Sequence, residues 1–355
     1  MFQIKKPLLI IFTICFSSIG FCQYTEQINS NRPGYSIGAF SVGKGVIQLE
    51  TGFELRNYEH SSFNQSTING TVAFLSIRWG FLLEQLELTY DGSYMFDQFT
   101  NKLSNNPTEI KRSGFLQNFL GIKYLIYDPF KKEEEINVYS WKANNGFKLK
   151  HLIPAISLTV GVNFDPFSEE NPYPYGDVFG TLYKPEFNQT LYYVAPSPTP
   201  LTLMGTIATQ SHFLGTWVFV TNFSLKRYLS EFIEKTYIIT LTHTFNPLWS
   251  VYIENQGIFS ERYSDNILRA GAAYLIGDNL QVEGTIGANA KNTPNFLSIN
   301  AGASYRLDFH KDFKDPKKIE KKKLKKEEKA LKKSSRKLKK QDKKRNKNAR
   351  KKPKQ

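Results

Sequence analysis

Cysteine is nearly absent from this sequence. Its two cysteines, Cys15 and Cys22, both fall in an apolar stretch within the first 22 residues. The chain after residue 22 has no cysteine, so that part holds no disulfide, no thiolate metal site and no cysteine nucleophile. No two of the five histidines stand at metal-ligand spacing, and no HExxH motif or glycine-rich phosphate loop occurs. We therefore predict neither a metal nor a cofactor.

Long apolar runs are also missing after residue 22. No later segment has about 18 uninterrupted apolar residues, and the mean hydropathy of −0.41 is too low for a helical membrane protein. At the start, two lysines precede an apolar run over residues 8–21, which ends just before Gln23. This order is typical of a secretory signal peptide over residues 1–22, and the run is shorter than a membrane span. A lipoprotein acylated at Cys22 is the alternative, which the bulky Phe21 disfavours.

Excess positive charge is confined to one end of the chain. The net charge is +15, but residues 310–355 alone carry 24 Lys and Arg against 6 Asp and Glu, so the preceding part is mildly acidic. We expect this Lys-rich tail to be disordered or partly helical, because its leucines recur once per heptad and a coiled coil needs two apolar positions. An exported tail without interleaved aromatics predicts no nucleic-acid partner. An anionic partner in the cell wall or envelope is the alternative role.

Alternating hydrophobicity is what the sequence has in abundance. In residues 45–56, apolar side chains take every second position and charged or amide side chains most of those between them. A strand turns successive side chains to opposite faces, so this period predicts one apolar and one polar face. The same period predicts twelve strands, at about 45–57, 67–79, 83–96, 113–127, 152–164, 201–211, 213–227, 236–245, 248–258, 265–276, 279–290 and 297–309.

Two assignments depend on strand parity, the rule that successive connections of an antiparallel sheet lie at alternate ends, rather than on the hydrophobic pattern. The loop over residues 165–200 is long and the turns after it are short, so the loop and those turns should lie at opposite ends of the sheet. That arrangement requires the weakly patterned strand at 201–211. Parity also makes the charged insertion at 128–149 a long connection on the periplasmic side.

A soluble sandwich and an outer-membrane barrel both explain such strands. The sandwich buries its apolar faces in a core, whereas the barrel turns them to lipid and lines its lumen with the polar faces. Strands of 10–14 residues exceed the usual ~5–6 of soluble sheets, and aromatics such as Trp79 cluster at strand ends. Only a closed barrel pairs every strand within lipid. We predict an all-β fold, a transmembrane antiparallel β-barrel of about twelve strands over residues 45–309.

The polar faces of these strands carry the candidate functional residues. In a barrel they line the lumen, either as a salt-bridge network that closes it or as a selectivity ring for a solute. The leader at 23–44 is a possible plug, because Arg32 needs an anionic partner and Glu50 or Glu54 could supply one. The candidates are Arg32, Glu50, Glu54, Arg56, Glu87, Lys123, Glu254, Arg269, Glu283 and Arg306.

An enzyme of the lipid surface is a further possibility with little support. It would need a nucleophile, a base and an orienting group in one place. His243, among three threonines, is the nearest candidate. Strand parity puts His243 on the apolar face, which favours an interface histidine over a catalytic one. We therefore predict no enzymatic activity.

Several short motifs resemble the outer-membrane family named for the putative MetA pathway of phenol degradation. The resemblance spans about residues 29–309, although Asn31 replaces the usual aspartate and the Lys-rich tail lies outside the pattern. It implies a transporter-like outer-membrane barrel, loosely linked to uptake of aromatic or other hydrophobic compounds. The motifs are Asn31-Arg32-Pro33, Gly45 to Phe53, Gly121 to Tyr124, Pro154 to Leu158, Val251 to Glu254 and Gly302 to Arg306.

The function predicted from these observations is passive uptake. We expect a porin-like channel in the outer membrane of a Gram-negative bacterium, in contact with membrane lipid and a small solute, for which a hydrophobic or aromatic compound is one candidate. The tail at 310–355 would then lie in the periplasm. A barrel with a closed lumen that anchors an envelope or secretion complex through its basic tail is the alternative.

Overall fold

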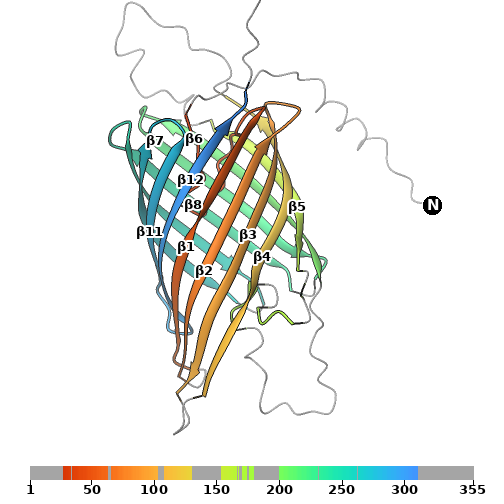
Figure 1. Cartoon of the computed structure of the whole chain (residues 1–355), viewed down its shortest axis with the longest axis vertical. Helices are drawn as coiled ribbons and strands as arrows, with labels where there is room; N and C mark the ends of the chain where they lie inside the picture. Colours follow the sequence, from red (N-terminus) through yellow and green to blue (C-terminus); the bar gives the residue numbers. More distant parts are fainter. Residues whose placement is uncertain are drawn as a thin grey trace, which may run out of the picture. The chain divides into compact units, whose positions relative to one another are not determined.

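The fold is a closed antiparallel barrel, seen in a computed structural model (Figure 1). The structure describes residues 27–310 except 33, 63–64, 103–107, 130–152, 166, 168–169, 174–175, 180–199, 231 and 262. The chain divides into two units, Met1–His310 and Lys311–Gln355. The predicted signal peptide, nearly all of the 128–149 insertion and the tail from residue 311 therefore lie outside the described residues.

The described residues form twelve strands. Each strand pairs antiparallel with its neighbours in the chain, and pairing of the last strand with the first closes the barrel. The strands are β1 (Val46–His60), β2 (Ser66–Gly80), β3 (Leu86–Asn101), β4 (Thr108–Tyr127), β5 (Ala155–Phe164), β6 (Leu201–Phe213), β7 (Trp217–Tyr228), β8 (Glu234–Thr244), β9 (Trp249–Phe259), β10 (Asp265–Ile276), β11 (Leu280–Asn289) and β12 (Asn295–Asp308).

The predicted fold class is confirmed, and each predicted strand overlaps one observed strand. The strand that parity required at 201–211 is present and forms most of β6. The bounds differ most in β3, which ends at Asn101 rather than 96, and in β4, which begins at Thr108 rather than 113. No helix in the described part of the chain is both long enough and apolar enough to cross a membrane.

Apolar side chains cover the outside of the barrel, as the alternation predicts. Phe53, Ile253 and Leu268 are each about 60% exposed although they are large and apolar, and water would not favour a belt of such residues. Trp79, Trp217 and Trp249 lie at the end where β1 begins and β12 ends, which we call the terminal end. A lipid-facing band bordered by aromatic residues is the exterior of a transmembrane barrel.

His243 belongs to this aromatic border. Its ring centroid lies 4.2 Å from that of Trp217 and 4.7 Å from that of Phe245. These contacts are those of an interface histidine, which agrees with the parity argument. Among the described residues, no group of three or more His, Cys, Asp or Glu could hold a metal ion.

At the opposite end, which we call the loop end, the two faces exchange character. Strands β1 to β4, of 15, 15, 16 and 20 residues, extend past their neighbours there (Figure 1). Their outer face becomes polar, and Asn57 donates a hydrogen bond to Asn69 on it. Their inner face becomes apolar, with Ile68 and Phe99 buried. The expectation of a polar lumen along the whole strand is therefore wrong at this end.

A segment of the β5–β6 connection packs against the inner wall of the barrel at the loop end. Tyr173, Val178 and Phe179 pack into one buried cluster with strand residues, and we call this cluster the cap. Burial raises the pKa of the Tyr173 hydroxyl. The cap has its own hydrophobic core, as expected for a part of the barrel that stands in water. Its strand members are Tyr58, Ile68, Val72, Met95, Phe99, Ile267 and Phe296.

Candidate functional site

The leader lies inside the barrel. Its described residues, 27–32 and 34–43, form the segment that we call the plug. The plug enters at the terminal end, where the Ile28 N–H donates to the Asp278 carbonyl in the β10–β11 turn. It returns to the same end, where the Gly45 N–H donates to the Gly80 carbonyl just before β1. The plug is thus a re-entrant segment with both ends at one mouth of the barrel.

Side chains of the wall take the place of strand partners for the plug. The Ile37 N–H donates to Asn222 Oδ1 at 2.7 Å, and Asn222 Nδ2 donates back to the Ile37 carbonyl at 2.8 Å. The Ala39 N–H donates to Gln210 Oε1 at 2.9 Å. A buried backbone needs such partners, and the plug forms no helix or strand of its own that would supply them. Polar wall residues therefore determine where the plug lies.

One charged cluster holds the plug near the terminal end. Arg78 on β2 makes a bidentate ion pair with Glu87 on β3, at 2.8 and 3.1 Å. Lys123 on β4 lies 3.7 Å from the same carboxylate and donates to the Phe40 carbonyl at 2.7 Å. The Val42 N–H donates to Glu87 Oε2 at 2.9 Å. All three charged side chains are almost fully buried, so each depends on these partners.

A second cluster holds the tip of the plug from opposite walls. Glu254 on β9 accepts the Tyr35 N–H at 2.9 Å and the Ser36 N–H at 3.1 Å, and pairs with Arg269 on β10 at 3.2 Å. The Tyr35 hydroxyl donates to Glu54 on β1 at 2.5 Å. Tyr35 thus links two walls of the lumen through its backbone and its side chain.

Arg32 does not have the anionic partner expected for it. It forms no ion pair with any residue that the structure describes, and its guanidinium carbon lies 4.0 Å from the centroid of the Phe74 ring. Glu50 instead accepts the Asn31 N–H, and Glu54 pairs with Arg56 at 2.7 Å. The hypothesis that Arg32 anchors the plug through Glu50 or Glu54 is therefore wrong.

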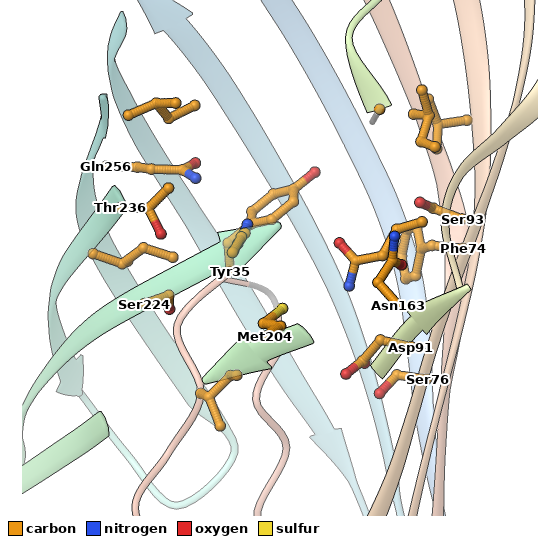
Figure 2. A pocket seen from close by; sticks show the side chains of 18 of the residues that line it. Tyr35, Phe74, Ser76, Asp91, Ser93, Asn163, Met204, Ser224, Thr236 and Gln256 are labelled. Atoms are coloured by element: carbon orange, nitrogen blue, oxygen red, sulfur yellow. The ribbon is translucent and has the colours of Figure 1, made fainter. Parts of the chain in front are cut away.

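A chamber of about 360 Å³ lies between the plug and the cap. Figure 2 shows Tyr35 reaching into it, with Phe74 and Asp91 on one side and Gln256 on the other. Its lining combines aromatic and aliphatic side chains with hydroxyls, amides and charges. This lining can contact an apolar body and hydrogen-bond a polar group at the same time.

The ten predicted residues all lie inside the barrel, and their part in selecting a solute stays a prediction. The structure brings together Lys123 with Glu87, Glu54 with Arg56, and Glu254 with Arg269. Glu283 and Arg306 instead contact neighbours at the terminal end, where Arg306 donates to the Gln27 carbonyl at 2.6 Å.

Sequence reasoning missed two important groups. Arg78 is 1% exposed and central to the Glu87 cluster. Its position between the apolar Ile77 and Trp79 could have assigned it to the inner face. Asp97 and Arg112, paired at 2.6 Å beside the cap, lie beyond the predicted ends of their strands. The hydrophobic alternation from which the strands were predicted does not extend to these two residues, so the sequence carried no signal for the pair.

Comparison with known families decides the relationship. The family described as "Putative MetA-pathway of phenol degradation" matches residues 30–175 and 194–307. The chain belongs to this family. This match confirms the resemblance seen in the sequence. The matched region begins within the plug and ends before the Lys-rich tail.

Several solved structures are similar to this family member in architecture. An outer membrane channel from Pseudomonas putida F1 has 11% identity and a TM-score of 0.44, over 79% of this chain and 100% of that one. The transport unit of the autotransporter AIDA-I from Escherichia coli has 12% identity and a TM-score of 0.43, over 78% and 92%. The CymD monoaromatic hydrocarbon channel has 8% identity and a TM-score of 0.35, over 76% and 90%. At such identities and scores, these similarities say nothing about the solute. A search among curated proteins finds no match.

Proposed function

We propose that this protein is an outer-membrane channel for passive uptake of a small solute with an apolar or aromatic part. In its resting state the plug closes the terminal end and the cap narrows the loop end. The observation that carries the proposal is how the plug is held. Hydrogen bonds from polar wall residues retain most of it in the lumen, and apolar packing is limited to a small cluster of Ala39 and Phe40 with Leu125 and Ala155. A segment bound in this way can leave, because water can replace each of those partners.

The width of the barrel supports the same proposal. Side chains alone fill the interior of a barrel of about eight strands, whereas barrels of 16–18 strands enclose an aqueous channel. Twelve strands enclose an interior between these limits, and here the plug occupies much of it. Withdrawal of the plug would leave a lumen lined by Glu87, Asn222 and Glu254. Such a lining suits water and small polar or amphipathic solutes.

The chamber supports a solute of modest size. Its volume of about 360 Å³ lies near the lower limit of the ~300–1,000 Å³ typical of small-molecule sites. Phe74 and Met204 offer apolar contact there, and Asn163 and Gln256 offer hydrogen bonds (Figure 2). The family's description in terms of phenol degradation agrees with a small aromatic solute.

Conductance in planar bilayers tests the proposal. We compare the mature chain with a variant that lacks residues 27–43, and follow the flux of small aromatic and aliphatic solutes into liposomes. We expect small or brief conductance from the intact chain, and a stable, several-fold larger conductance from the variant. A correctly folded variant that conducts no more than the intact chain would refute the channel.

A second function is favoured by the plug at the terminal end and the cap at the loop end, which together occupy much of the lumen. In this alternative the barrel does not conduct, and it anchors an envelope or secretion complex through its basic tail at 310–355. The plug and the cap would then be permanent. This alternative expects no conductance from either chain, together with co-purification of anionic envelope components that is lost when residues 311–355 are deleted.

A further inference from the structure

Phe74 lies on a floor made of two glycines. On the inner wall, one cross-strand row runs from Glu283 on β11 through Gly302 on β12 and Gly52 on β1 to Phe74 on β2. A Cβ atom on Gly52 would lie 2.6 Å from Phe74 Cζ, and one on Gly302 would lie 3.2 Å from it. The tip of the ring therefore lies close over both glycines, and a larger residue at either position would displace it. Its other face is turned to the lumen.

The guanidinium of Arg32 covers that free face. Its carbon lies 4.0 Å from the Phe74 centroid and 5.4 Å from the Tyr35 centroid, which is the geometry of a cation–π contact. Arg56 and Arg269, the other arginines beside Tyr35, are paired with carboxylates at 2.7 and 3.2 Å. Arg32 has no such partner among the described residues, and its Nη1 is buried without a hydrogen bond. The ring, rather than a single carboxylate, is the partner of this charge.

Three carboxylates surround the same ring. Glu283 is only 8% exposed, its Oε1 accepts no hydrogen bond within the described part of the chain, and this atom lies 3.2 Å from the Cβ position of Gly302. Glu50 on β1 and Asp91 on β3 are diagonal neighbours of Phe74 on its two sides. Asp91 forms no ion pair with any described residue, and Glu50 reaches Arg78 only at 3.7 Å. Carboxyl groups are thus concentrated where Arg32 lies.

We propose that the Phe74 face, with Glu50, Asp91 and Glu283 around it, is a binding site for an organic cation, and that Arg32 occupies it as a tethered ligand at rest. The cation is a guanidinium or alkylammonium group, and the rest of the solute lies in the chamber. A solute of this class competes with Arg32 and displaces the tip of the plug. The inference rests on the proposed channel function and narrows its solute to one with a cationic group.

Calorimetric titration of the full-length Arg32→Ala variant in detergent tests the site directly. The probes are methylguanidinium and its neutral analogue N-methylurea. We expect methylguanidinium to bind about tenfold or more tightly than N-methylurea, because both probes can donate hydrogen bonds but only the charged one adds a cation–π contact and attraction to carboxylate charge. We also expect weaker binding of methylguanidinium to the wild type and to Arg32→Lys, where the site is already occupied. If the alanine variant does not fold, Arg32→Gln removes the charge at similar side-chain length, and the same outcomes apply.

The matched control removes the ring and leaves the carboxylates in place. We expect the double variant Arg32→Ala, Phe74→Leu to lose most of the preference for methylguanidinium. Equal binding of both probes to Arg32→Ala, no binding of either, or a preference that survives loss of the ring would each overturn the proposal. Calorimetry requires no conductance, so the two proposals fail separately. A barrel that binds the cation but never conducts refutes only the channel, and one that conducts without binding refutes only the site.

Discussion

Removing the charge of the Glu254 carboxylate should release the tip of the plug, residues Tyr35 and Ser36. Glu254 is 2% exposed and accepts two backbone N–H groups of the plug, from Tyr35 at 2.9 Å and Ser36 at 3.1 Å. The same carboxylate accepts the Thr240 hydroxyl at 3.0 Å and pairs with Arg269. Glu254→Gln keeps the size of the side chain and removes its charge. Both plug bonds go to one oxygen, Oε2, so the amide oxygen of glutamine can accept both, but they change from charge-assisted to neutral, while the NH₂ group replaces the oxygen that accepts from Arg269.

The size of the effect follows from these contacts. A hydrogen bond to a charged group contributes about 1.5–3 kcal/mol, and a neutral one contributes about 1 kcal/mol. Summed over two bonds, the plug loses ~2 kcal/mol of binding free energy. Since about 1.4 kcal/mol corresponds to a factor of ten, the equilibrium between bound and released plug should shift by about thirtyfold.

Single-channel recording measures that shift as the frequency of openings. Thr240→Val is the matched control, because it removes a hydrogen bond from the same carboxylate without touching the plug. We expect Glu254→Gln to raise the opening frequency by about thirtyfold and Thr240→Val by no more than a few-fold. Glu254→Gln channels that open as rarely as the wild type would show that these bonds do not retain the plug.

Two further predictions concern the wall of the barrel. Ile253→Lys places a charge on the apolar exterior and should destabilise the barrel in lipid by about 2–4 kcal/mol, while Asn57→Lys, on the polar outer face at the loop end, should cost about 0–1 kcal/mol. Urea unfolding in liposomes compares the two, and equal losses would contradict a lipid boundary between these positions. Gly302→Ala should displace the Phe74 ring and lower the free energy of unfolding by about 1–3 kcal/mol. The new Cβ would lie 3.2 Å from Phe74 Cζ and 2.8 Å from the Thr51 carbonyl oxygen. In Gly284→Ala the nearest atom is 3.8 Å away, so a similar loss of thermal stability in both variants would argue against the glycine floor.

Period-two alternation was sufficient to predict the wall of this protein. The pattern around Ile253 and Glu254 assigns one side chain to lipid and the other to the lumen, and the structure places them so. The strand Leu201–Phe213 has a weak pattern, but a closed antiparallel sheet with loops at alternate ends still requires it. Alternation and parity are properties of the backbone, so they hold wherever the strands pair.

What each face meets is not a property of the backbone. Tyr58 and Asn57 follow the alternation as regularly as Leu55 does, yet near them the inner side becomes the apolar one. We infer that the two faces exchange character where the hydrocarbon of the bilayer ends. The alternation of side chains along a strand does not indicate that position. The partner of Arg32 was unpredictable for a related reason. Phe74 comes within reach only because Gly52 and Gly302, distant in sequence, leave room for its ring.

The plug and the cap differ in chemistry, and in the proposed channel that difference would constrain how a solute passes. The cap is an apolar cluster, so it should loosen for a solute that can replace contacts among Phe179, Tyr58 and Phe296. The plug is held mainly by carboxylates and amides and covers an aromatic face with Arg32, so a solute must compete for polar contacts to displace it. A purely apolar molecule would loosen the cap without releasing the plug. A solute with an apolar body and a charged or hydrogen-bonding group would act on both.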